Sequence, residues 1–294
     1  MRILFILLLL LSKIIVSFYF NKNIDLTLRK ELTIKAKLCK ICYCKNHTFN
    51  IKRNKMLNIY DNYTYINDTN NKSFCYIFYN KNKIDICFKG TSNINDFYSN
   101  LQICPSNYFN NTNIQIHNGF LSKYLSLKNS ILSIINTIGI NYNNNDSKQI
   151  EISFNGHSSG GGIATIAALD FSYIYDNYNI KCYTFGAPII GNSYFINEFN
   201  KRINKNKNRN NSYRIINEYD IIPYLNLYEN TDINDMNMNI KLNSNDNNNN
   251  NNNYEQEIKL KNVKRTPLIK IIKNIYEYLK TIHGITRYIK NLND

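Results

Sequence analysis

The clearest change between hydrophobic and polar positions lies near the middle of the chain. Apolar β-branched and aromatic residues dominate residues 150–155, Gly-His-Ser-Ser-Gly occupies residues 156–160, and small residues and alanines follow. A short apolar run, a glycine-bounded turn and a small-residue segment predict a strand, a sharp turn and a helix in that order.

Similar patterns on both sides of this turn predict further strands and helices. Residues 80–83 are expected to form a hairpin turn, residues 55–72 are polar and turn-rich, and Gly139 is expected to end a helix. Strands are predicted at residues 73–79, 84–88, 180–185 and 213–217, and helices at 23–38, 93–101, 121–138, 194–204 and 266–292. The alternation of strands with helices predicts an α/β fold with a mostly parallel central sheet flanked by helices.

Length and composition suit one such domain. The chain has 294 residues, 43% of them hydrophobic, which is enough for a substantial core. Residues 243–253 are almost entirely Asn and Asp, so we expect a disordered insertion without packing capacity. Residues 18–294 are therefore predicted to form a single domain with this insertion.

The first residues form a separate segment. Met1 and Arg2 precede a short leucine-rich run, and Lys13 interrupts the apolar stretch before it reaches the length of a membrane span. A basic start with a short apolar core predicts a secretory signal peptide at residues 1–17 and a secreted mature protein. An uncleaved signal anchor in the membrane is the alternative.

Charge and cysteine content indicate which partners and which covalent modifications suit the chain. The formal net charge of +15 is spread along a chain in which about a fifth of the residues are Asn, so compositional bias is a sufficient explanation. No nucleic-acid motif is present, and neither a nucleic acid nor an obligate protein partner is predicted. Seven cysteines suggest up to three disulfides and one free thiol. Glycosylation sequons occur at Asn46, Asn62, Asn67, Asn71, Asn110, Asn145 and Asn210.

Three of the cysteines resemble half of a metal site. Cys39, Cys42 and Cys44 are closely spaced, but the second half of such a cluster is missing, and His47 alone would not complete it. We therefore predict no metal and no other cofactor.

The predicted turn at residues 156–160 matches G-x-S-x-G, the nucleophile elbow. A serine hydroxyl needs a base to remove its proton, so Ser158 must stand exposed at a strained turn. Gly156 and Gly160 would let the strand and the helix pack closely. The backbone N–H of Ser159, at the start of the helix, can point at a developing oxyanion.

A catalytic triad would place an acid and then a histidine after the serine. Asp220 follows the strand at residues 213–217, where a carboxylate can orient an imidazole, although a turn aspartate would look the same. His283 is the only histidine downstream of Ser158. The predicted roles are Ser158 as nucleophile, His283 as general base and acid, and Asp220 as the group that orients His283. His117 precedes the elbow, and the side chain of His157 should turn away from Ser158.

Several motifs together resemble the class 3 lipases, the fungal-type triacylglycerol lipases of the α/β-hydrolase superfamily. The similarity covers most of the chain between Cys39 and Tyr228 and resumes around His283. The matching pieces are Phe88-Lys89-Gly90-Thr91-Ser92-Asn93-Ile94-Asn95-Asp96-Phe97, His117-Asn118-Gly119-Phe120, Gly156-His157-Ser158-Ser159-Gly160-Gly161, Phe185-Gly186-Ala187-Pro188 with Gly191-Asn192, and Tyr219-Asp220-Ile221-Ile222-Pro223.

The resemblance implies an α/β-hydrolase fold with a short lid helix at residues 93–101. It also implies that Thr91 supplies a second oxyanion donor beside the N–H of Ser159. The lid would carry Ile94, Phe97, Tyr98 and Leu101 on its apolar face. Ser159 stands where the family usually has leucine, and Lys89 stands in place of the usual arginine.

The sequence thus predicts a secreted serine hydrolase that cleaves carboxylic esters of lipids through an acyl-enzyme. Its partners would be a lipid ester, of acylglycerol or phospholipid type, and a lipid–water interface. A catalytically inactive α/β-hydrolase that binds lipid or protein is the alternative. A membrane-anchored structural protein would leave the elbow unexplained.

Overall fold

The computed structural model describes the greater part of the predicted domain. The described residues are 26–44, 59–91, 105–142, 150–175, 178–204, 211–217, 220, 222–224, 256–260, 284–286 and 288–289. The predicted signal peptide, the lid, the Asn-rich insertion and His283 lie outside these ranges.

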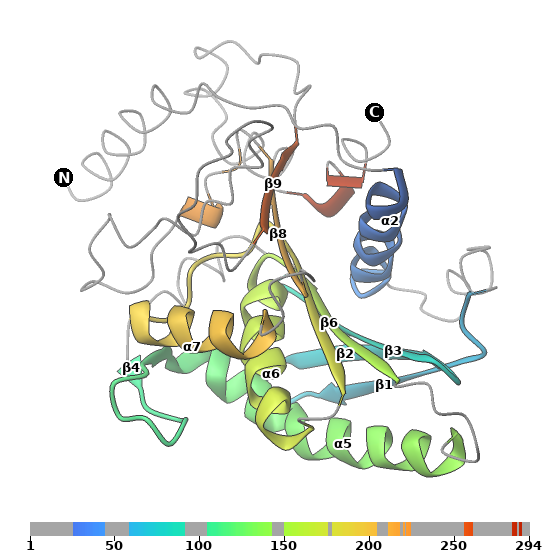
Figure 1. Cartoon of the computed structure of the whole chain (residues 1–294), viewed down its shortest axis with the longest axis horizontal. Coiled ribbons are helices and arrows are strands. Elements are labelled where there is room, and N and C mark those ends of the chain that lie inside the picture. The colour runs from blue at the N-terminus through green and yellow to red at the C-terminus, as the bar shows by residue number, and fades with distance from the viewer. Residues whose placement is uncertain are drawn as a thin grey trace.

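A sheet of seven strands forms the centre of the molecule (Figure 1). The strands β1 and β2 pair antiparallel, as do β2 and β3, whereas the pairs β3–β6, β6–β7, β7–β8 and β8–β9 are parallel. Their bounds in spatial order are β1 Asn62–Asp68, β2 Ser73–Asn80, β3 Lys83–Phe88, β6 Glu151–His157, β7 Asn179–Phe185, β8 Ser212–Asn217 and β9 Gln256–Leu260. The central sheet is therefore mostly parallel, as the sequence predicted.

Helices cover both faces of this sheet. The helices α5 (Asn118–Tyr142), α6 (Ser159–Ile174) and α7 (Ser193–Ile203) lie on one face, and α2 (Leu26–Ile41) lies on the other (Figure 1). A short 3-10 helix spans Ile222–Tyr224, and a small ribbon pairs β4 (Pro105–Ser106) with β5 (Ile116–His117).

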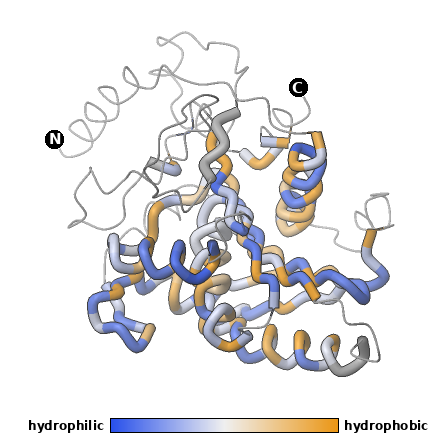
Figure 2. Tube along the Cα trace, in the orientation of Figure 1, coloured by the Kyte–Doolittle hydropathy of each residue, from blue (hydrophilic) through white to orange (hydrophobic). Residues whose placement is uncertain are grey.

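Successive side chains of a strand point to opposite faces of the sheet, so each face has its own hydrophobic core. In β7, Cys182 packs with the α5–α7 helices, whereas Tyr183 packs with α2. Strand β6 is buried from Ile152 to His157 because helices lie on both of its sides. The hydropathy colouring shows apolar positions concentrated where helices meet the sheet (Figure 2).

Several local predictions are wrong at their edges. Residues 55–72 were predicted to be turns, but β1 occupies part of them because its pairing with β2 compensates for a polar sequence. Helix α5 continues past Gly139 to Tyr142. The six cysteines that the structure describes are all thiols, so the predicted disulfides find no support among them.

Candidate active site

Ser158 occupies a sharp turn between the central strand and the first helix after it. Strand β6 ends at His157, helix α6 begins at Ser159, and Ser158 has φ 58° and ψ −132°. A non-glycine residue with positive φ costs of order 1–3 kcal/mol and persists only where its surroundings hold it. The N–H of Ser158 donates to Phe185 O at 2.9 Å, and Gly161 N–H donates to Ser158 O at 2.9 Å. The predicted nucleophile therefore has the strained backbone of an elbow.

The glycines around this turn allow an unusually close approach of strand and helix. A Cβ atom on Gly156 would lie 2.1 Å from Gly160 O, and one on Gly160 would lie 2.4 Å from Phe88 O. Both distances are shorter than real side chains tolerate. The close packing predicted for these two glycines is present.

The loop after β3 brings Thr91 to the start of α6. Gly90 packs so tightly that a Cβ atom there would lie 2.5 Å from His157 O. The N–H of Thr91 donates to Ser159 Oγ at 2.7 Å, and the hydroxyls of the two residues are 2.9 Å apart. The two residues predicted to supply oxyanion donors are thus in direct contact beside Ser158.

Asp220 lies just beyond β8, at the end of the sheet where the carboxyl ends of the parallel strands meet. It is 1% exposed, and it accepts hydrogen bonds from Tyr288 Oη at 2.5 Å and from Ile222 N–H at 3.0 Å. Because His283 lies outside the described residues, the structure does not test its pairing with Asp220.

Tyr288 is the site residue that the sequence did not single out. Its ring contacts those of His157 and Phe185, with centroids 5.9 and 6.2 Å apart, respectively. Ile285 and Tyr288 also join the apolar cluster on the α2 face. The segment directly after His283 therefore packs beside Asp220 and the elbow. The nearness of Tyr288 to His283 in sequence is the one signal that could have indicated this role.

Comparison with known proteins relates this arrangement to a family. The family model described as Lipase (class 3) matches residues 86–229, which include Thr91, Ser158 and Asp220. Over these residues the chain is similar to the class 3 lipases.

One relative and two solved structures illustrate the similarity. A lipase of Rhizomucor miehei is 28% identical over 146 residues, covering 48% of this chain and 37% of that protein. The structure of the Rhizomucor miehei triacylglyceride lipase has a TM-score of 0.59 and 22% identity, covering 69% of this chain and 76% of that one. A triacylglycerol lipase from Penicillium expansum has a TM-score of 0.56 and 17% identity, with 69% and 75% covered.

The two described histidines have structural partners. His157 Nδ1 lies 3.0 Å from Tyr43 Oη of the segment after α2, so its ring is directed to the α2 face. His117 is 1% exposed, its Nδ1 accepts from Gly119 N–H at 3.1 Å, and burial lowers its pKa. Both residues thereby hold the loops around them in place.

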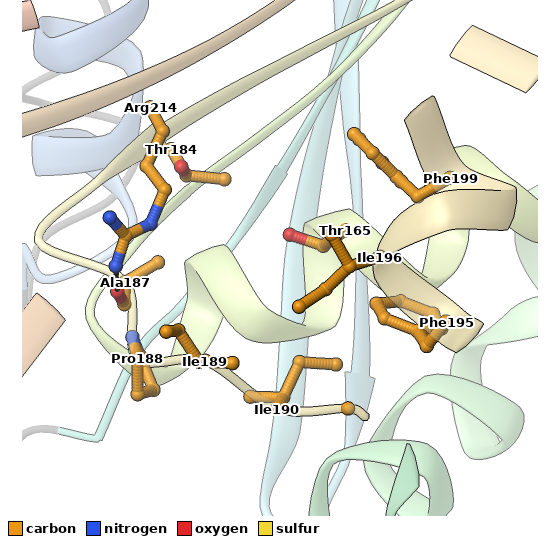
Figure 3. Close-up of a pocket in the computed structure, with 11 residues that line it drawn as sticks. Thr165, Thr184, Ala187, Pro188, Ile189, Ile190, Phe195, Ile196, Phe199 and Arg214 are labelled. Atoms are coloured by element: carbon orange, nitrogen blue, oxygen red, sulfur yellow. Dashed lines mark hydrogen bonds between the residues drawn. The ribbon is translucent and has the colours of Figure 1, made fainter. Parts of the chain in front are cut away.

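A small cavity lies behind the elbow helix of the class 3 lipase fold (Figure 3). It has a volume of about 30 Å³, which is room for one or two water molecules and not for an acyl chain. Thr184 lines it with a buried hydroxyl that has no hydrogen-bond partner among the described residues, and Arg214 stands at the same end. We therefore do not assign substrate binding to this cavity.

Within the described ranges, no three His, Cys, Asp or Glu side chains are grouped to hold a metal ion, and this includes Cys39, Cys42 and Cys44. Of the helices in those ranges, none has both the length and the apolarity that crossing a bilayer requires.

Proposed function

We propose that this protein is a secreted serine hydrolase that cleaves carboxylic esters of lipids. The observation that carries the proposal is the backbone of Ser158, which is strained between strand and helix with Thr91 of the preceding loop beside it. The match of residues 86–229 to the class 3 lipase family model adds support. One similar structure, with a TM-score of 0.59 and 22% identity, is that of a triacylglycerol lipase whose catalytic centre is a serine protease triad.

The proposed reaction forms and then hydrolyses an acyl-enzyme. Ser158 Oγ attacks the ester carbonyl carbon while its proton passes to His283. The tetrahedral oxyanion accepts hydrogen bonds from the N–H groups of Thr91 and Ser159. Collapse of this intermediate expels the alcohol, which takes the proton from His283. Water, deprotonated by the same histidine, then releases the carboxylic acid and regenerates Ser158.

Asp220 would act on His283 and not on the substrate. A carboxylate fixed by Tyr288 and by the N–H of Ile222 can hold one imidazole tautomer and stabilise the imidazolium that forms. Asp220 directly follows β8, and Ser158 directly follows β6. The parallel strands place both residues at the same end of the sheet, which supports this role.

The proposed substrate is a lipid ester at a lipid–water interface, with acylglycerols and phospholipids as the two candidate classes. Ser158 is 6% exposed, so a bulky ester can reach it only after a covering segment moves. The predicted lid at residues 93–101, with Ile94, Phe97, Tyr98 and Leu101, is our candidate for that segment. Secretion rests on the predicted signal peptide at residues 1–17.

Labelling with a fluorophosphonate probe tests the proposal directly. The purified mature protein, with and without detergent micelles, should become labelled at Ser158 in peptide mapping. The matched control is Ser126→Ala, which removes the hydroxyl that donates to Lys123 O on α5 and should leave labelling unchanged. Ser158→Ala should remove it. Absence of labelling under both conditions would instead favour an inactive hydrolase fold that binds lipid or protein.

A further inference from the structure

The contact between Thr91 and Ser159 has a geometry that bears on the reaction itself. Thr91 N–H donates to Ser159 Oγ at 2.7 Å, a short distance for an N–H···O hydrogen bond, and the two hydroxyl oxygens are 2.9 Å apart. Ser159 is 4% exposed, so water competes little for its hydroxyl. The side chain that follows the nucleophile is therefore held against the predicted oxyanion donor.

The Ser159 hydroxyl stands where an oxyanion would bind to Thr91. An oxyanion donor is effective when its nitrogen lies about 2.7–3.1 Å from the oxygen that becomes charged. Ser159 Oγ has this distance from Thr91 N. Covalent geometry also keeps any serine Oγ within about 3–4 Å of its own backbone nitrogen. The hydroxyl consequently lies near both nitrogens that are proposed to bind the oxyanion.

Thr91 does not depend on Ser159 for its position. The preceding residues fix the loop, because Lys89 N–H donates to Phe74 O at 2.9 Å. Gly90 is enclosed so closely that a Cβ atom there would lie 2.2 Å from Tyr43 Oη and 2.5 Å from His157 O. Removing the Ser159 hydroxyl should therefore free the N–H of Thr91 without releasing the loop.

We propose that the Ser159 hydroxyl caps the oxyanion hole in the resting protein and must rotate away before an ester carbonyl can bind there. The proposal rests on the function proposed above for Ser158. Rotation about one side-chain bond is enough to exchange the hydroxyl for the carbonyl oxygen of the substrate. Ser159 thus acts through Thr91 as a positioning residue that slows acylation, in addition to donating its own N–H.

The expected size of the effect follows from the hydrogen bond that is exchanged. A neutral hydrogen bond contributes modestly to a folded protein, so its loss in the resting state should accelerate acylation by about threefold to tenfold. Ser159→Ala removes the cap and keeps the backbone N–H. Ser159→Thr keeps a hydroxyl on a side chain with restricted rotation and should give no acceleration.

The experiment measures the second-order rate of fluorophosphonate labelling at Ser158 in the full mature chain. We expect the rate for Ser159→Ala to exceed that of the wild type by about threefold to tenfold. Affinity for a trifluoromethyl ketone, whose adduct with Ser158 carries an oxyanion, should increase by the same factor, which a general loosening of the fold would not produce. Thr165→Ala is the matched control, because it removes a hydroxyl of the same helix that donates to Gly161 O at 2.9 Å.

The outcomes separate this inference from the proposed function. Labelling of Ser158 at an equal or lower rate in Ser159→Ala would overturn the cap and leave the serine hydrolase intact. Failure of every variant and of the wild type to label would overturn both proposals. If Ser159→Ala does not fold, as judged by its thermal unfolding, the glycine variant Ser159→Gly, which also lacks the hydroxyl, takes its place with the same expected gain.

Discussion

Asp85 and Asp220 are two aspartates that the fold buries almost completely, with 0% and 1% of their surface exposed, and their partners differ in kind. Asp85 lies within β3 and meets the ammonium of Lys35 from α2 at 2.6 Å. The hydroxyls of Tyr60 and Ser153 also donate to it. Asp220 lies at the edge of the sheet and accepts from the Tyr288 hydroxyl and the Ile222 N–H, which are neutral donors.

The two sets of partners bear on what each carboxylate can do. A charge that is already paired with an ammonium inside the sheet stabilises the docking of α2 and has little left to offer a third group. A carboxylate at the end of a strand that accepts from Tyr288 and Ile222 can also stabilise the imidazolium proposed for His283. Burial alone therefore does not separate a structural aspartate from a proposed catalytic one.

The largest expected effect is at Asp220, the proposed triad member of this pair. Asp220→Asn should lower kcat for a soluble ester by about four orders of magnitude, because an amide cannot select the same imidazole tautomer or stabilise its charge. Its thermal unfolding should remain close to that of the wild type, since the amide oxygen can still accept from Ile222 N–H and the amide NH2 can donate to the hydroxyl oxygen of Tyr288. A kcat within tenfold of the wild type would remove Asp220 from the triad.

The corresponding change at Asp85 should damage stability and not chemistry. Asp85→Asn leaves the ammonium of Lys35 buried without its counter-charge, and we expect the free energy of unfolding to fall by about 3–5 kcal/mol. Urea unfolding measures this loss, and titration of the active serine allows kcat to be expressed per folded molecule. That kcat should equal the wild-type value. A reduced kcat in the folded fraction would mean that Asp85 contributes to the site.

Removing both charges tests whether the unpaired ammonium of Lys35 causes the loss of stability in Asp85→Asn. In Lys35→Met/Asp85→Asn no unpaired ammonium remains, one of the hydroxyls of Tyr60 and Ser153 keeps an acceptor oxygen, and the other can accept from the amide NH2. We expect this double variant to recover about 2 kcal/mol or more of the stability lost in Asp85→Asn, as measured by urea unfolding. Equal stability of the single and double variants would show that the ion pair is not the source of the loss.

These residues also show what the sequence could and could not predict. The elbow was predictable because Gly156, Ser158 and Gly160 act locally, through turn geometry and the close approach of one strand and one helix. The parallel sheet was predictable from the alternation of apolar segments. The position of Asp220 after β8 followed from the order of the strands.

Contacts between distant segments were not predictable. Lys35 lies in the helix predicted at residues 23–38, and its burial depends on Asp85, 50 residues away, and on Ser153. The contact between Thr91 and Ser159 joins residues 68 positions apart, and β9 was missed because its pairing with β8 defines it better than its own sequence does. Such pairs depend on tertiary packing, which local periodicity does not encode.

A smaller effect is expected at Tyr288. Tyr288→Phe removes the hydroxyl that donates to Asp220 and frees the carboxylate to rotate, so kcat should fall about tenfold, in line with the strength of hydrogen bonds to charged groups. Tyr43→Phe is the matched control, since it removes a phenol that faces His157 instead. Its kcat should stay within about threefold of the wild type, a smaller change than one lost neutral hydrogen bond can cause. Equal losses in the two variants would argue against a specific link between Tyr288 and Asp220.

The smallest expected effect is the pH dependence of the structural pair. Burial alone would raise the pKa of Asp85, but the ammonium groups of Lys35 and Lys83 and the hydrogen bonds from Lys35 and Ser153 together outweigh it, and the pKa lies below the ordinary value of 3.8. A lowered carboxyl pKa adds stability that is fully present above pH 3.8 and is lost as pH falls through the folded-state value. The wild type should therefore lose more free energy of unfolding between pH 6 and pH 3 than Lys35→Met/Asp85→Asn does, because the remaining carboxylates are common to both proteins. An equal or larger loss in the double variant would mean that Asp85 is not ionised in the folded protein, and the contrast with Asp220 would then have to rest on hydrogen bonding alone.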